Sequence, residues 1–313
     1  MIGLEPHLIL RTKRANKVEK NQSSFGYVGN ILFDRMVGAT IHTCTPGEYG
    51  RVGSNALVEA LCQDLEEMPR SQSSTRVDGA KKRVYKIPVG GSNGLGTWGY
   101  IEAVEELMLQ IDGMDKEQTD NIDHVVFACG SGGSAAGIAL GLTLAYCEKK
   151  RIEAMPKIHA IGVCDDPNYF YATIASIAEE MGLDLTTLPF VSEAISQDIS
   201  MEDFVRNHMT VHQGKGMGYA SSTPEELDFI LKFAIETGIV LDPVYSGKAM
   251  YQFVQEMKMS PDTYRDSNIM FWHTGGSLGM FEKVEALSSQ LEKVSPVKRM
   301  DVYGKKRSYR TDY

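Results

Sequence analysis

Several features that would place a protein in a common functional class are missing from this chain of 313 residues. Lysine and arginine number 32 against 41 aspartate and glutamate residues, and the net charge of -9 excludes nucleic acid as the main partner. No apolar run is long enough to span a bilayer, and Glu5 and Pro6 interrupt the start where a signal peptide would be apolar. We therefore expect an intracellular protein, cytoplasmic by default, that binds neither nucleic acid nor membrane.

Metal and nucleotide motifs are also missing. The five cysteines are widely spaced and form no Cys-x-x-Cys pair and no His–Cys metal spacing, so we expect free thiols and no metal. No Gly-x-Gly-x-x-Gly follows the first expected strand, and no Gly-Lys-Ser/Thr phosphate loop occurs. These absences favour a phosphate-bearing cofactor over a nucleotide.

What the sequence does contain is an alternation of strand-like and helix-like segments, which predicts an α/β fold with doubly wound parallel sheets. The expected strands are residues 7–11, 39–44, 83–88, 124–128, 157–163 and 268–272. The expected helices are residues 28–37, 55–68, 98–114, 135–149, 169–181, 224–237, 247–257 and 278–291, with Thr223 as the N-cap of the helix that Pro224 begins. Residues 69–82 read as a polar surface loop and residues 295–313 as a basic tail.

The most informative segment is residues 125–137, VVFACGSGGSAAG. An apolar strand is followed by a glycine-rich turn and then by a helix rich in alanine and leucine, which is the geometry that binds a phosphate. Glycines let the backbone N–H groups approach the ligand, and the hydroxyls donate to phosphate oxygens. The alternative is a tight turn that binds nothing. The residues of this turn are Gly130, Ser131, Gly132, Gly133 and Ser134.

Three further strand ends carry glycines or hydroxyls. They are residues 88–96 with Ser92 and Asn93, residues 241–248 with Tyr245 and Ser246, and residues 273–277 with His273, Thr274 and Gly275. A weaker candidate loop holds Tyr219. Because ligands bind at the carboxyl ends of parallel strands, these loops outline one cleft for a phosphate and an aromatic polar body. Structural readings stay open: Ser246 as an N-cap, Tyr245 in the core, and His273 as a turn residue.

On these motifs the chain resembles the D-cysteine desulfhydrase and 1-aminocyclopropane-1-carboxylate deaminase family, whose members are pyridoxal-phosphate enzymes of the tryptophan-synthase-β-like fold (fold type II). The matching segments, in family order, are GLEPHLILRT at 3–12, GNILFDRMVGA at 29–39, IPVGGSNGLGTWGY at 87–100, ACGSGGSAAG at 128–137, GIVLDPVYSGKAM at 238–250 and HTGG at 273–276. The resemblance implies a cofactor cleft between two doubly wound domains, residues 1–90 and 91–294, with the smaller domain incomplete.

The resemblance also implies roles for single residues. The turn 130–134 resembles the cradle of the cofactor phosphate, with Thr274 and Gly275 beside the cofactor and Ser92 and Asn93 in the substrate cleft. Tyr219 and Tyr245 resemble the two catalytic tyrosines that flank the cofactor ring. Ser246 stands where the deaminases carry a glutamate and the desulfhydrases a threonine facing the pyridine nitrogen. A hydroxyl makes a weaker electron sink than a carboxylate, which favours thiol elimination from D-cysteine to pyruvate, hydrogen sulfide and ammonia.

One departure from the family pattern bears on activity. The family's Gly-Gly-Asn-Lys segment, which supplies the Schiff-base lysine, and its Gln-Ser-Asn-His segment do not occur here. We expect a family member that begins after this lysine, and hence either a lyase in a longer form or an inactive homologue. The alternative substrate is 1-aminocyclopropane-1-carboxylate. The resemblance further implies a homodimer, and a leading peptide would direct the protein to mitochondria or plastids.

Overall fold

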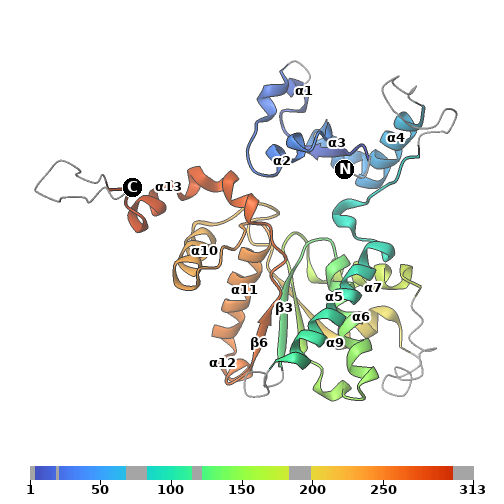
Figure 1. The fold of residues 1–313 in the computed structure, drawn as a ribbon, viewed down its shortest axis with the longest axis vertical. Helices are drawn as coiled ribbons and strands as arrows, with labels where there is room; N and C mark the ends of the chain where they lie inside the picture. The colour runs from blue at the N-terminus through green and yellow to red at the C-terminus, as the bar shows by residue number, and fades with distance from the viewer. Residues whose placement is uncertain (1–3, 19–20, 68–82, 115–121, 183–198, 299–313) are drawn as a thin grey trace, which may run out of the picture.

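The computed structural model describes residues 4–18, 21–67, 83–114, 122–182 and 199–298. Two parallel sheets organise them: β1 and β2 form one, and the other has the strand order β5-β4-β3-β6 (Figure 1). The strands are β1 His7–Arg11, β2 Thr40–Cys44, β3 His124–Cys129, β4 Lys157–Gly162, β5 Met209–Gln213 and β6 Ile269–Phe271. Every strand pair in the two sheets is parallel, as the alternating sequence pattern predicts.

Helices connect these strands. The α-helices are α1 Ala15–Val18, α2 Asn30–Met36, α3 Pro46–Val52, α4 Ser54–Glu67, α5 Gly94–Gly113, α6 Gly133–Glu148, α7 Pro167–Glu180, α9 Met201–His208, α10 Pro224–Thr237, α11 Ser246–Met259, α12 Pro261–Tyr264 and α13 Val284–Val294. The 3-10 helices are η1 Gln22–Phe25, η2 Val89–Gly91, η3 Ile152–Ala154 and η4 Ser277–Lys283.

The four-stranded sheet is covered on both faces. Helices α5, α6, α7 and α9 lie on one side and α10, α11 and α12 on the other (Figure 1). Side chains alternate accordingly along β3: Val125 and Phe127 join the larger core cluster, whereas Val126 packs with Phe253 of α11. This double coverage explains why β3 reads as a continuous apolar run.

Helix α6 is buried nearly all round, which requires small residues where α5 crosses it. A Cβ on Gly137 would lie 2.4 Å from Cβ of Tyr100, and one on Gly141 would lie 2.9 Å from Cβ of Val104. The two helices therefore pack closely enough that neither position accepts a larger residue. This contact fixes the helix whose N-terminus forms the candidate phosphate site.

A row of three histidines crosses the face of the sheet that α11 and α12 cover. Nδ1 of His124 lies 2.9 Å from Nε2 of His159, and Nδ1 of His159 lies 2.9 Å from Nε2 of His212. His159 is 5% exposed and contacts the rings of Phe253 and Tyr264. Burial lowers the pKa of all three imidazoles, that of His159 to about 3. We call these residues the histidine ladder.

In the smaller sheet, a local sequence signal marks where β2 ends and α3 begins. Thr45 and Glu48 form a capping box at the start of α3, directly after β2. Its two strands share no strand pairing with the four-stranded sheet in the described part of the chain. A domain division near residue 90 stays a prediction.

The structure corrects several expected elements. Residues 83–88 form no strand, and neither does the apolar run 239–241 that leads to the candidate turn at 241–248. The strand β5 and the helices α3 and α9 were not predicted, and the expected helix 278–291 begins as the 3-10 helix η4 and continues as α13. The polar loop 69–82 and most of the tail 295–313 lie outside the described residues.

Candidate cofactor site

The predicted phosphate turn lies between the end of β3 and the first turn of α6. Gly132 occupies the left-handed region with φ of 91°, which a residue without a Cβ adopts at no steric cost. The N-cap residue Gly132 has no side chain with which to cap α6. The first N–H groups of a helix have no acceptor inside it, so those that follow Gly133 in α6 are available to an anion, which the helix dipole stabilises.

Ser92 joins the loop after η2 to this turn. Its Oγ lies 2.6 Å from Oγ of Ser131 and accepts the N–H of Gly133 at 3.3 Å. Two hydroxyls and a helix N-terminus thus meet at one point, which is the donor set that a phosphate requires. Asn93 caps α5, because its Oδ1 accepts the N–H of Gly96, and its place in a substrate cleft stays a prediction.

The two predicted tyrosines meet above the turn. The hydroxyls of Tyr219 and Tyr245 lie 2.8 Å apart. A Cβ on Gly130 would lie 2.7 Å from Cε1 of Tyr245, so this ring rests directly against the turn. Burial, followed by the hydrogen bond with Tyr219, raises the pKa of Tyr245, which keeps its phenol protonated at neutral pH.

Arg11, at the carboxyl end of β1, reaches the same pair from the smaller sheet. Its guanidinium lies 5.7 Å from the ring centre of Tyr219 and 4.5 Å from that of Tyr49. A residue of the smaller sheet therefore borders the tyrosine pair.

Asp242 organises the turn before α11, and the sequence analysis did not single it out. Its carboxylate is buried and accepts the N–H groups of Val244, Tyr245 and Ser246 at 2.7–2.8 Å. The hydroxyl of Ser246 donates to Oδ1 of Asp242 and accepts the N–H of Asp242. Asp242, rather than Ser246, thus satisfies the N–H groups at the start of α11.

The HTGG segment packs beside Asp242. A Cβ on Gly276 would lie 3.1 Å from Cγ of Asp242. His273 is a turn residue, since its Nδ1 accepts the N–H of Gly275 and its Nε2 lies 3.2 Å from the oxygen of Val240. Thr274 and Gly275 are exposed in this segment. Their place beside a cofactor stays a prediction, as do the roles given to the other site residues.

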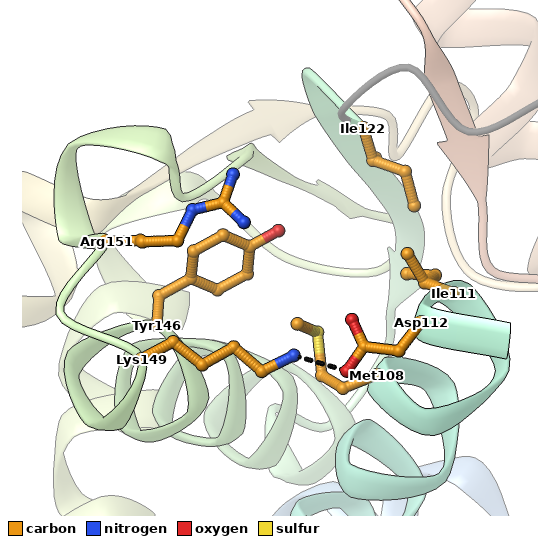
Figure 2. A pocket seen from close by; sticks show the side chains of 7 residues that line it. All are labelled: Met108, Ile111, Asp112, Ile122, Tyr146, Lys149 and Arg151. Carbon is orange, nitrogen blue, oxygen red and sulfur yellow. Dashed lines mark hydrogen bonds and ion pairs between the residues drawn. The ribbon is translucent and has the colours of Figure 1, made fainter. Parts of the chain in front are cut away.

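A surface pocket lies at the opposite end of α5 and α6. Figure 2 shows Met108, Ile111 and Ile122 on one side of it and the phenol of Tyr146 on the other. Lys149 donates to Asp112 at 2.7 Å across its rim. The pocket is lined by none of the predicted site residues, so it is separate from the candidate cofactor site.

In the described part of the chain, no group of three His, Cys, Asp or Glu side chains could hold a metal ion. All five cysteines are free. Within the same residues, no helix combines the length and the apolar character needed to cross a membrane.

Comparison with known proteins identifies the family that this geometry indicates. Residues 4–275 match the family described as pyridoxal-phosphate dependent enzyme, and the chain belongs to that family. Pyridoxal phosphate is the cofactor on which the family depends. The enzyme class, the cofactor and the α/β fold expected from the sequence are confirmed.

Individual relatives narrow the resemblance. The chain is 40% identical over 301 residues to a bifunctional D-cysteine desulfhydrase/1-aminocyclopropane-1-carboxylate deaminase, mitochondrial, from Arabidopsis thaliana, covering 96% of the chain and 64% of that protein. It is 29% identical over 288 residues to a putative 1-aminocyclopropane-1-carboxylate deaminase of Thermotoga maritima, covering 91% and 73%. A crystal structure of an ACC deaminase homologue superimposes with a TM-score of 0.62 at 25% identity, covering 92% and 71%. The chain therefore spans less than two thirds of the length of its Arabidopsis relative.

The residues present fit the cofactor. A phosphate matches the glycine turn, the N-terminus of α6 and the hydroxyls of Ser92 and Ser131. The ring of Tyr245 forms a wall against Gly130, where a planar aromatic group can lie.

Proposed function

We propose that this chain binds pyridoxal phosphate at the turn 130–134 and serves a carbon–sulfur lyase acting on D-cysteine. The observation that carries the binding site is the junction of Ser92, Ser131 and the N–H of Gly133 at the start of α6. Pyridoxal phosphate, when bound, supplies an electron-withdrawing ring that stabilises negative charge at the substrate α-carbon.

The chain's own residues would bind and orient. The turn holds the phosphate, and Tyr245 covers one side of the ring while keeping its phenolic proton. Tyr219 hydrogen-bonds that phenol and so fixes the position of its oxygen. A phenol that keeps its proton can donate a hydrogen bond to a leaving group such as a thiolate, whereas its raised pKa disfavours complete proton transfer.

Ser246 supports desulfhydration over deamination. Its hydroxyl is neutral and its proton is directed at Oδ1 of Asp242. The side chain at this position is not a carboxylate that would keep a pyridine nitrogen protonated, and elimination of a thiolate needs a weaker electron sink than opening a cyclopropane. The Arabidopsis relative carries both activities in its name, so the deaminase is the alternative.

The second candidate is an inactive homologue, and the burial and bonding of the Lys248 amine favour it. The 313 residues contain no Gly-Gly-Asn-Lys segment. Lys248, three positions after Tyr245, has a fully buried amine engaged with the oxygen of Lys215 and with Glu226. An amine held in this way is not free to attack a carbonyl.

The binding proposal is tested by Ser134→Asp in the 313-residue chain. A carboxylate at the turn would oppose the cofactor phosphate, and we expect at least tenfold weaker binding in a titration with pyridoxal phosphate followed by absorbance. The matched control is Ser289→Asp on exposed α13, which should bind as the unaltered chain does. Equal affinity of all three proteins would refute the site.

The two functions are separated by assaying the same chain with pyridoxal phosphate and D-cysteine, and with 1-aminocyclopropane-1-carboxylate in parallel. Sulfide release and a borohydride-trapped cofactor on one defined lysine would establish the lyase. Cofactor binding without either result would show that these 313 residues alone do not act as a lyase, which is the result expected for an inactive homologue. We propose further that the protein is an intracellular homodimer acting on a small amino acid; a single-chain mass in solution would exclude the dimer.

A further inference from the structure

Lys248 is a buried amine for which the proposed function has no use. Its side chain is 0% exposed and leaves the first turn of α11. Its Nζ donates to the backbone oxygen of Lys215 at 2.9 Å and lies 3.6 Å from Oε1 of Glu226. Because a buried charge is retained only when it is paired and hydrogen-bonded, these two contacts account for its presence.

Glu226, the ion-pair partner of Lys248, also caps a helix. It lies in the first turn of α10, where its Oε2 accepts the N–H of Thr223 at 2.8 Å in a capping box. One carboxylate oxygen thus closes the helix start while the other faces Lys248. The ion pair ties α10 to α11 at the ends that border the tyrosine pair.

The glycine turn before Tyr219 is wrapped around this ion pair. The oxygen of Lys215 accepts both Nζ of Lys248 and the N–H of Gly218, the latter at 3.0 Å. Gly216 has φ of 54°, and a Cβ there would lie 2.8 Å from Oε1 of Glu226 and 3.2 Å from Nζ of Lys248. The turn therefore rests directly on the two charged groups, with no space for a side chain between them.

We propose that the Lys248–Glu226 ion pair positions Tyr219. It holds residues 215–218 so that the hydroxyl of Tyr219 meets that of Tyr245, and one turn of α11 supplies both Tyr245 and the lysine that places its partner. Lys248 is thus a positioning residue and not a nucleophile. The catalytic importance of the tyrosine pair rests on the proposed function. The positioning of Tyr219 by the Lys248–Glu226 ion pair does not depend on it.

The test follows the Tyr245 signal by NMR in chain labelled with ¹³C at the tyrosine Cζ, without cofactor or substrate. Tyr219→Phe and Tyr245→Phe assign the two signals and show where the Tyr245 signal falls when its partner hydroxyl is gone. Lys248→Met should move the Tyr245 signal to that same place. Lys248→Arg, which keeps the charge and donors, should restore at least part of the shift.

Controls separate positioning from general stability. Lys232→Met removes an exposed ion pair with Glu236 on α10 and should leave the Tyr245 signal unchanged. Glu226→Gln keeps a capping side chain but removes the charge facing Lys248, so it decides the matter if Lys248→Met does not fold. An unchanged Tyr245 signal in the folded Lys248→Met or Glu226→Gln protein would overturn the proposal. Since no cofactor is present, this result is independent of the titration that tests the proposed function.

Discussion

The histidine ladder makes the stability of this fold dependent on pH. Each bond between neighbouring rings needs one N–H and one lone pair, so the neutral ladder has all three protons pointing the same way. With Nδ1–H donating along the row, the proton of His212 faces Oε1 of Glu256, 3.8 Å away. If one ring gains a proton, both inter-histidine hydrogen bonds can still form, because the neighbouring neutral rings can change tautomer. If a second ring gains a proton, two N–H groups must face each other at one of the two contacts.

Other groups around the ladder set its response to acid. Lys157 lowers the pKa of His124 and His159, while Asp123 acts in the opposite direction on His124 and Glu256 on His212. The phenol of Tyr264, which contacts His124 and His159, is neutral in this range because burial raises its pKa. Burial outweighs the carboxylates, so all three rings resist protonation in the folded state.

The magnitude follows from His159, whose pKa falls from 6.5 to about 3 on folding. A lowered histidine pKa gives stability that is complete above 6.5 and is lost as the pH falls toward 3. At pH 5 the unfolded chain binds the proton and the folded chain does not, which removes about 2 kcal/mol of unfolding free energy. We expect His159→Gln to lower the free energy of unfolding at pH 7.5. We also expect it to reduce the difference in unfolding free energy between pH 7.5 and pH 5 by about 2 kcal/mol.

The assay is denaturant unfolding at pH 7.5 and pH 5, with ¹⁵N imidazole NMR to show that His159 stays neutral at pH 5. His208→Gln is the control, because His208 lies on α9 and contacts the oxygen of Phe204 rather than the ladder. It should keep the pH dependence of the unaltered chain. If His159→Gln has that same dependence, or if His159 titrates near its ordinary pKa, the reasoning is refuted.

Three further predictions concern the site and its support. Gly130→Ala should displace the ring of Tyr245 and weaken pyridoxal phosphate binding at least tenfold, whereas Gly99→Ala, where a Cβ meets nothing within 4 Å, should not. Ser246→Glu, in a form of the protein shown to release sulfide, should shift turnover away from D-cysteine; an unchanged product ratio would contradict the role given to Ser246. Gly94→Ala would place a Cβ 2.7 Å from the backbone carbon of Glu180, and should destabilise the contact between α5 and α7 by about 1–3 kcal/mol in thermal unfolding.

The sequence predicted the elements whose signals are local. The strand over residues 7–11 and the helix over 224–237 agree with β1 and α10 at both ends, the latter because Thr223 and Pro224 mark its start. Strand β5 was missed because MTVHQ has little apolar character; it is an edge strand stabilised by pairing with β4. Conversely, residues 83–88 have a strand-like composition but no neighbouring strand in the described structure to pair with.

The same distinction applies to the site. The strand, glycine turn and helix at 124–148 are contiguous and were recognisable, whereas the bond between Ser92 and Ser131 joins residues 39 positions apart. Asp242 was missed, although an Asp-Pro pair before a helix is a known turn signal that indicates a side chain accepting nearby N–H groups. The ion pair of Lys248 and Glu226 depends on two helices meeting and has no local signal.

The burial of α6 has a consequence for how a ligand would be received. Its N-terminal turn belongs to the larger apolar core cluster, so the phosphate half of the site has little conformational entropy left to lose on binding. The segment with Tyr219 is partly exposed and connects β5 to α10, and it is secured by a few polar contacts. Affinity for a phosphate should therefore be nearly independent of whether residues 214–222 become ordered. The entropic cost of ordering these residues should fall mainly on recognition of the group attached to the phosphate. Amide hydrogen exchange would show this as slow exchange in α6 with and without ligand, and as a ligand-dependent slowing confined to the segment around Tyr219.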